Sequence, residues 1–180
     1  AHNPEIREFL VNKAPFVNII FGTRNFHRLP AFLKENIEHK KRIVADETDE
    51  TPGLLPARRG NPVKGYVTIM YGCNNFCSYC IVPYTRGREK SRPPEEIIEE
   101  VTQLAANGYR EVTLLGQNVN SYGKDLAVQV NFARLLECLD EISGLYRIRY
   151  MTSHPRDFTE ELIETIAASD KVCEHFHLPI

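Results

Sequence analysis

A regular alternation of short apolar runs with amphipathic stretches begins at Tyr66 and limits the possible folds more than any other feature. Four runs rich in apolar and β-branched residues are typical of strands: YVTIMYG (66–72), EVTLLG (111–116), YRIRYM (146–151) and VCEHFHLPI (172–180). Stretches with helical periodicity separate them, at 93–108, 131–142 and 159–168. Strands that alternate with helices form βαβ units around a parallel sheet. We therefore predict an α/β fold in which helices cover a curved parallel sheet.

The first two of these helices carry the clearest sequence signals. The stretch 93–108 has Pro and Glu in its first turn and ends with Asn107 and Gly108, which are start and stop signals. Its apolar stripe comprises Ile97, Ile98, Val101, Leu104 and Ala105. The stripe of the second helix comprises Phe132, Leu135, Leu136, Leu139 and Ile142. Each stripe predicts a helix face that is buried against the sheet.

The chain of 180 residues has room for one domain and part of another. A closed barrel of alternating strands and helices has eight strands, and only four are predicted here, so we expect a truncated, partial (βα) barrel at 63–180. Residues 1–36 predict a helix near 4–11, a short buried strand at 17–22 and a helix around 29–33, a small α/β segment that belongs to a preceding domain. The charged, turn-rich range 37–62 predicts a linker.

Composition excludes several classes of protein. The net charge is −2, so any basic surface for a partner must be local rather than global. The first residues, AHNPEIREF, are too polar for a signal peptide, and no apolar run approaches the roughly 18 residues of a membrane span. We expect a cytoplasmic protein with no membrane partner. Five cysteines, an odd and clustered set, indicate a metal or catalytic site rather than a secreted disulfide framework.

The cysteine cluster consists of Cys73, Cys77 and Cys80, directly after the first predicted strand, where sites of α/β proteins lie. Unrelated buried thiols are usually single, a structural zinc site has four ligands, and a ferredoxin supplies four cysteines per cluster. Cys138 and Cys173 lie far along the chain and are poor candidates for a fourth ligand. Three thiolates on a four-iron cluster leave one iron open to a substrate, by the logic of catalytic metal sites.

The pattern C-x3-C-x2-C at the end of a first barrel strand, with Tyr79 just before the last cysteine, resembles the radical S-adenosylmethionine superfamily. This resemblance implies that Cys73, Cys77 and Cys80 hold a [4Fe–4S] cluster, whose open iron is chelated by the amino and carboxylate groups of S-adenosylmethionine. An electron from the cluster then cleaves the sulfonium to give a 5′-deoxyadenosyl radical. The hard chemistry is the cofactor's, and the protein supplies position.

Neighbouring segments narrow the resemblance to the methylthiotransferase family. The segments are VPYTRGREKSR, LLGQNVNSYG, MTSHPRDF and HFHLP, and VNIIFGTRNFHRLP resembles the end of that family's amino-terminal domain. Among its branches they are most similar to the MiaB type, which converts N6-isopentenyladenosine in tRNA to its 2-methylthio derivative. The implied partners are tRNA and a cellular electron donor. The sister branch that modifies a ribosomal protein remains an alternative, as does a small zinc-dependent RNA-binding module.

The sequence departs from the family pattern in two respects. No cysteine precedes Cys73, whereas the family carries three upstream cysteines for a second [4Fe–4S] cluster that inserts sulfur. The last barrel strands and a carboxyl-terminal RNA-binding TRAM domain are also missing. We therefore expect a fragment of such an enzyme, which does not carry out methylthiolation alone.

Other polar residues have competing interpretations, and no catalytic residue is assigned. The resemblance implies that Tyr79, the aromatic just before the last cysteine, takes part in cofactor binding. Gln117 and Asn118 are also candidates, because superfamily members often bind the amino group of S-adenosylmethionine after the second strand. A turn cap is the alternative for Gln117 and Asn118. Candidates for contact with RNA phosphates or with the cofactor's carboxylate are Arg86, Arg88, Lys90 and Arg92. A solvated basic face would have the same pattern.

Three residues near the end of the chain resemble a metal site by spacing alone. Cys173, His175 and His177 alternate along the fourth predicted strand and would share one of its faces. We interpret them instead as lining the interior of the partial barrel, where polar groups surround a cofactor. Ser153 and His154, which follow the third strand, are interpreted as part of the pocket wall.

Overall fold

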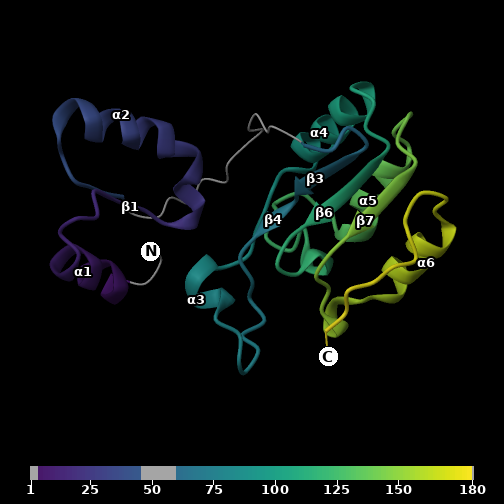
Figure 1. The fold of residues 1–180 in the computed structure, drawn as a ribbon. Coiled ribbons are helices and arrows are strands. Elements are labelled where there is room, and N and C mark those ends of the chain that lie inside the picture. Colours follow the sequence, from purple (N-terminus) through teal and green to yellow (C-terminus); the bar gives the residue numbers. More distant parts are fainter. Residues whose placement is uncertain (1–3, 46–59, 180) are drawn as a thin grey trace. The chain divides into compact units, whose positions relative to one another are not determined.

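The computed structural model describes residues 4–45 and 60–179 (Figure 1). The described residues divide into two compact units. One contains 4–45 together with Cys73–Arg88, and the other contains 60–72 and 89–179.

The second unit is built on a parallel sheet of three strands in the order β3-β6-β7. These strands are β3 (Lys64–Thr68), β6 (Glu111–Leu115) and β7 (Arg147–Tyr150). The register aligns Val67 with Leu114, and Leu114 with Tyr150. All neighbouring pairs are parallel, which confirms the prediction from the alternating sequence.

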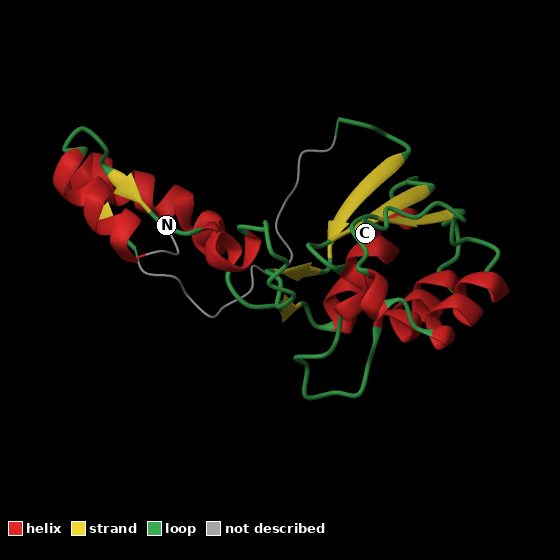
Figure 2. Ribbon diagram, turned by 90° about the horizontal axis from the view of Figure 1, so that it is seen from below, coloured by secondary structure: helices red, strands yellow, loops and turns green. Residues whose placement is uncertain are grey.

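Three helices lie on one side of this sheet, as Figure 2 shows: α4 (Pro94–Ala106), α5 (Phe132–Asp140) and α6 (Glu160–Ala168). The side-chain oxygens of Asn131 and Thr159 accept hydrogen bonds from backbone N–H groups in the first turns of α5 and α6, which fixes where both helices begin. The α4 helix packs so closely on β3 that a Cβ atom at Gly65 would lie 2.9 Å from Leu104 Cδ1. The predicted apolar stripes form the core with the strands.

The first predicted strand, 66–72, is divided in the structure. β3 ends at Thr68, and β4 (Met70–Tyr71) pairs antiparallel with β5 (Lys90–Ser91). The break is at Ile69, whose N–H still donates to the Leu115 carbonyl while its own carbonyl accepts from Arg92 N–H. The chain therefore leaves the parallel sheet there and enters a short antiparallel stem, in which Tyr71 pairs with Lys90.

The prediction of a fourth strand at 172–180 is wrong for the described residues. A single parallel bridge joins Val172 to Ile148, and no ladder follows it. The reason is local: the His175 N–H donates to the Cys173 carbonyl at 2.7 Å, a tight turn that withdraws this amide from pairing with β7. The structure thus has a parallel α/β sheet, and a partial barrel stays a prediction.

The first unit contains a smaller α/β arrangement. Its elements are α1 (Pro4–Lys13), β1 (Ile19–Ile20), the 3-10 helix η1 (Thr23–Arg28), α2 (Leu29–His39) and β2 (Ile43–Val44). β1 and β2 pair in parallel. The Arg42 guanidinium donates to the carbonyls of Leu10, Val11 and Ala14 at the end of α1.

Both helices predicted in 1–36 are confirmed, and both are longer than predicted. The predicted linker, 37–62, begins within α2 and includes β2, so its first residues belong to packed structure. Residues 46–59 of that range lie outside the described residues. Among the helices that are described, none combines the length and apolar character that crossing a membrane requires.

Candidate metal centre and cofactor site

The cysteines lie on a loop, 73–88, whose two ends are held together. Gly72 and Gly87 have positive φ values of 72° and 75°, a backbone conformation that glycine adopts without steric cost. Between them, the Cys73 N–H donates to the Gly87 carbonyl at 3.1 Å. Because Tyr71 and Lys90 pair just outside these residues, the loop leaves and re-enters the chain at a closed base.

None of the three cysteines is in a disulfide, and they differ in exposure. Cys73 is buried, whereas Cys77 and Cys80 are partly exposed. A turn links the last two, since the Cys80 N–H donates to the Cys77 carbonyl at 2.9 Å. The loop does not bring the three side chains into one ligand group: in the described ranges, no three His, Cys, Asp or Glu side chains are placed to hold a metal ion.

The chemistry of this donor set nevertheless fits an iron–sulfur cluster. Thiolates are the usual ligands of such clusters, and residues 73–80 contain no helix or strand that would resist rearrangement. Metal sites commonly gain their geometry when the metal binds, because a preformed ligand set rarely exists without it. Ordering of this loop by iron and sulfide is therefore the step that would bring Cys73, Cys77 and Cys80 together.

Aromatic side chains of the same loop are exposed. Tyr79, predicted to bind the cofactor, is 87% exposed. Phe76 and Tyr84 pack edge to face, with ring centroids 5.8 Å apart, although both remain largely exposed. Within the loop, a short helix, α3 (Val82–Arg86), carries Tyr84 and follows directly after the last cysteine.

The basic run does not form one surface. Arg86, in the last turn of α3, and Arg88 are exposed, and Lys90 in β5 is half-buried. Arg92 is only 3% exposed, which argues against the predicted contact between its side chain and RNA. Its Nη1 donates to the Thr68 carbonyl at 2.7 Å and to Glu100 Oε2 at 2.8 Å.

The sequence does signal the ion pair that Arg92 forms. Arg92, Glu96 and Glu100 are spaced by four residues, so that both carboxylates face back toward the arginine from the first turns of α4. The Arg92 Nε also lies 3.7 Å from Glu96 Oε2, which is an ion pair but too long for a hydrogen bond. The arginine thus ties β3 to the start of α4.

We expect Arg92→Met to lower the free energy of unfolding by about 3 kcal/mol, because it leaves the largely buried Glu100 carboxylate without its cation. The Arg92 and Glu100 side chains are only 4% and 14% exposed. Urea unfolding measures the loss. The double variant Arg92→Met, Glu100→Leu should recover most of it, since both charges are then absent. A loss below about 1 kcal/mol in the single variant would contradict a structural role.

The residues after β6 present two acceptor oxygens without partners. Asn118 is 1% exposed, and its Nδ2 donates to Asp157 Oδ2 at 2.6 Å. Its Oδ1 is buried and unpaired, as is Oε1 of the neighbouring Gln117. Neither is a turn cap of the short 3-10 helix η2 (Val119–Ser121), which has no side-chain cap. The carboxyl end of the central strand β6 is therefore followed by two buried oxygens that can accept hydrogen bonds from a ligand.

Asp157 is a site residue that the sequence did not reveal. It ends the 3-10 helix η3 (Pro155–Asp157), is 5% exposed, and binds Lys124 Nζ through Oδ1 at 2.6 Å. Burial raises the pKa of its carboxyl, but hydrogen bonds from Lys124 and Asn118 and the nearby charges of Lys124 and Arg156 outweigh burial and hold the pKa below its ordinary value. Asp157 is therefore ionised at neutral pH.

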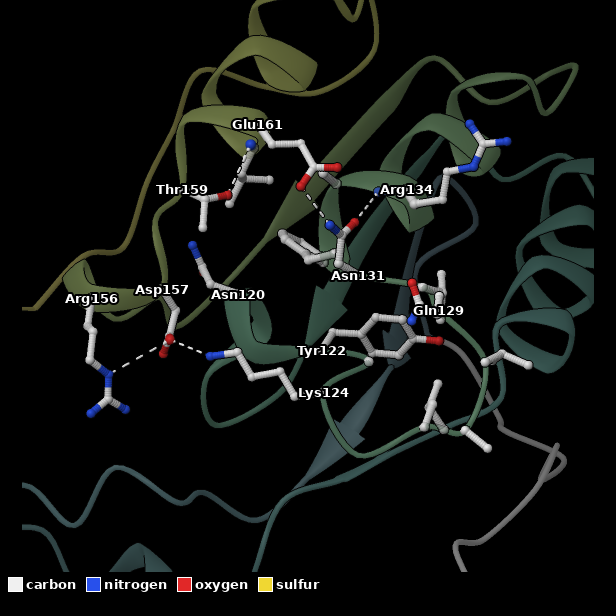
Figure 3. A pocket seen from close by; sticks show the side chains of 18 residues that line it. Asn120, Tyr122, Lys124, Gln129, Asn131, Arg134, Arg156, Asp157, Thr159 and Glu161 are labelled. Carbon is white, nitrogen blue, oxygen red and sulfur yellow. Dashed lines mark hydrogen bonds and ion pairs between the residues drawn. The ribbon is translucent and has the colours of Figure 1, made fainter.

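A cavity of about 780 Å³ adjoins this group (Figure 3). The loop between η2 and α5 lines it, together with the first residues of α5 and α6. Its charged lining side chains are Lys124, Arg134, Arg156, Asp157 and Glu161. Both amide atoms of Asn120, another lining residue, are buried and unpaired. No periodicity or motif in the sequence signals this cavity.

The residues near the end of the chain do not form a site on one strand face. Because the fourth strand is absent from the described residues, the expected alternation of Cys173, His175 and His177 does not apply. Cys173 is half-buried, and both histidines are exposed. Ser153 is buried with an unpaired Oγ, and its N–H donates to the His177 carbonyl at 2.9 Å.

Comparison with known proteins identifies a matching family and similar relatives. Residues 67–180 match the family described as the Radical SAM superfamily. Two similar relatives are both named tRNA-2-methylthio-N(6)-dimethylallyladenosine synthase. The one from Pelotomaculum thermopropionicum is 59% identical over 173 residues, which is 92% of this chain and 38% of that protein. The one from Moorella thermoacetica is 56% identical over 180 residues, which is 98% of this chain and 40% of that protein.

Among solved structures, a radical S-adenosylmethionine methyltransferase from Kitasatospora setae, TsrM, is similar in fold. It was solved with tryptophan and a cofactor analogue bound. The match has a TM-score of 0.50 at 21% sequence identity and covers 65% of this chain and 22% of that chain. Compared with the two synthases named above, the chain spans about two fifths of the length of these curated relatives.

Proposed function

Because this chain belongs to the radical S-adenosylmethionine superfamily, we propose that it supplies the cofactor-binding region of an enzyme that adds a methylthio group to N6-isopentenyladenosine in tRNA. The observation that carries the proposal is the 59% identity, over 92% of the chain, to a synthase named for that product. Since the chain spans 38% of that synthase, the proposal concerns the reaction to which this region contributes.

The roles of the residues in the cysteine loop follow from the cofactors that the superfamily uses. Cys73, Cys77 and Cys80 would hold a [4Fe–4S] cluster, and because the loop has no fourth cysteine, the cluster would keep a position at which S-adenosylmethionine binds. When bound, the reduced cluster and S-adenosylmethionine supply the radical chemistry. The exposed Tyr79 ring offers an apolar surface beside the last cysteine.

Other residues of the chain bind and orient the cofactor and the tRNA. The unpaired oxygens of Gln117 and Asn118 are suited to accept hydrogen bonds from the cofactor's amino group. Arg86, Arg88 and Lys90 remain as contacts for RNA phosphates, because they are not buried as Arg92 is. A tRNA substrate and a cellular electron donor place the enzyme in the cytoplasm. Further strands beside β7 would complete a partial barrel.

A chimera tests the proposal. The segment of the Pelotomaculum thermopropionicum synthase that matches this chain is replaced by it, and the chimera is expressed in bacteria that lack their own synthase. Mass spectrometry of digested tRNA should then show 2-methylthio-N6-isopentenyladenosine. The matched control carries Cys73→Ala, Cys77→Ala and Cys80→Ala and should give none. If the tRNA stays unmodified and a ribosomal protein is methylthiolated instead, the chain belongs to the sister branch. If the protein binds stoichiometric zinc in place of iron, the result favours a zinc-dependent RNA-binding module.

A further inference from the structure

Asn118, Asp157 and Lys124 form a continuous chain of polar contacts from the end of the central strand to the surface. Asn118 Nδ2 donates to one oxygen of Asp157, and Lys124 Nζ donates to the other, each at 2.6 Å. Asn118 and Asp157 are almost fully buried, whereas the Lys124 side chain is 59% exposed. The Asp157 carboxylate therefore has a separate donor for each of its oxygens.

This arrangement decides which way the Asn118 amide points. A primary amide has a donor end and an acceptor end, and an ionised carboxylate only accepts. If the amide were rotated by half a turn, its oxygen would face the Asp157 oxygen, and two acceptors would meet without a proton between them. Asp157 therefore holds the NH₂ group, and the Asn118 oxygen points away from it. That oxygen has no partner in the described part of the chain.

A buried acceptor without a donor destabilises a protein unless a ligand satisfies it. Two such oxygens, Asn118 Oδ1 and Gln117 Oε1, lie on adjacent residues after β6. A ligand group that satisfies such acceptors is an amino group, whose N–H groups donate hydrogen bonds. The amino group of S-adenosylmethionine has this chemistry.

We propose that Asp157 is a positioning residue: together with Lys124 it fixes the Asn118 amide so that its oxygen receives the amino group of S-adenosylmethionine. The inference rests on the proposed function for the identity of the cofactor. Asp157 itself does not touch the cofactor. It acts by excluding the rotated amide, whose NH₂ group would face the N–H donors of the cofactor's amino group.

The test measures binding, not turnover, on the anaerobically reconstituted chain. Equilibrium dialysis gives the affinities for S-adenosylmethionine and for 5′-methylthioadenosine, which keeps the nucleoside but lacks the amino and carboxylate groups. In Asp157→Asn the Asn118 amide can adopt either orientation. The affinity for S-adenosylmethionine should fall about tenfold, the usual cost of one misdirected buried hydrogen bond. The affinity for 5′-methylthioadenosine should stay within about twofold, because that ligand lacks the amino group that the Asn118 oxygen receives.

Two further variants separate positioning from a general structural effect. In an Asn118→Leu background, Asp157→Asn should cause no additional loss for S-adenosylmethionine, since the two residues act as one unit. Asp170→Asn, at an exposed aspartate, is the matched control and should change neither affinity. If Asp157→Asn does not fold, Lys124→Met carries the test, and a loss of about threefold restricted to S-adenosylmethionine is expected.

The outcomes distinguish this inference from the proposed function. Failure of the unaltered, reconstituted chain to bind S-adenosylmethionine would overturn both. Normal binding by the unaltered chain, with Asp157→Asn weakening the two ligands equally or neither, would overturn the positioning role alone. A loss restricted to S-adenosylmethionine and abolished in the Asn118→Leu background supports it.

Discussion

Anaerobic reconstitution of the triple variant Cys73→Ala, Cys77→Ala, Cys80→Ala is expected to give a protein with no bound iron or sulfide, whereas the unaltered chain takes up about four of each. The loop contains no other cysteine, and no alternative group of three ligands exists among the described residues. Each single substitution should leave the cluster labile or absent. Iron and acid-labile sulfide analysis measures the effect directly.

Cys138→Ala and Cys173→Ala are the matched controls and should retain the full cluster. Cys138 lies in α5, and Cys173 follows the single bridge to β7, so both are outside the loop. Addition of S-adenosylmethionine to the reduced, unaltered chain should perturb the electron paramagnetic resonance spectrum of the cluster. Full iron and sulfide in the triple variant would end the ligand assignment.

The second large effect is expected at Gly123, which follows η2. Its φ is +89°, and an added Cβ would lie 1.9 Å from the Val130 carbonyl oxygen, a backbone atom that cannot move like the end of a side chain. The Gly123 N–H also donates to Ser91 Oγ, which holds the residue in place. Gly123→Ala should therefore lower the free energy of unfolding by about 4 kcal/mol, from backbone strain and overpacking together.

Gly108→Ala separates these two causes. Gly108 follows α4 with a nearly identical φ of +91°, but an added Cβ there would meet nothing within 4 Å. Only the strain remains, so the expected loss is about 1 kcal/mol. Urea unfolding of both variants measures the difference. Equal losses would show that the loop 123–130 rearranges to admit the methyl group, contrary to the prediction.

The central strands and helices were accessible from sequence because local signals agree there. In α4, a proline at the start, the apolar stripe and Asn107-Gly108 at the end all indicate the same helix, and the structure has it at Pro94–Ala106. Alternation of strands with helices then leaves parallel pairing as the consistent topology. The fourth strand failed because an apolar run does not reveal whether its amides pair with a neighbour, and His175 bonds locally instead.

The candidate site was predictable only where it is local in sequence. The cysteine loop follows from spacing, but the contact between Asn118 and Asp157 joins residues 39 positions apart. Their proximity depends on how the chain continues after β6 and β7, where the Val119 N–H donates to the Thr152 carbonyl. Likewise, the spacing of Arg92 and Glu100 permits an ion pair, and only packing shows that it is buried.

The closed base of the cysteine loop has a consequence for cluster assembly. Joining the ends of a flexible segment costs conformational entropy that grows with the logarithm of its length. In this protein, the β4–β5 pairing and the hydrogen bond from Cys73 to Gly87 join the ends of the loop when the polypeptide folds, so this entropy is already lost before iron binds. Iron and sulfide then encounter three thiols tethered at millimolar effective concentration, about as for a short flexible linker. Maturation should accordingly follow folding, and denaturant that opens the stem should release iron before the parallel sheet unfolds.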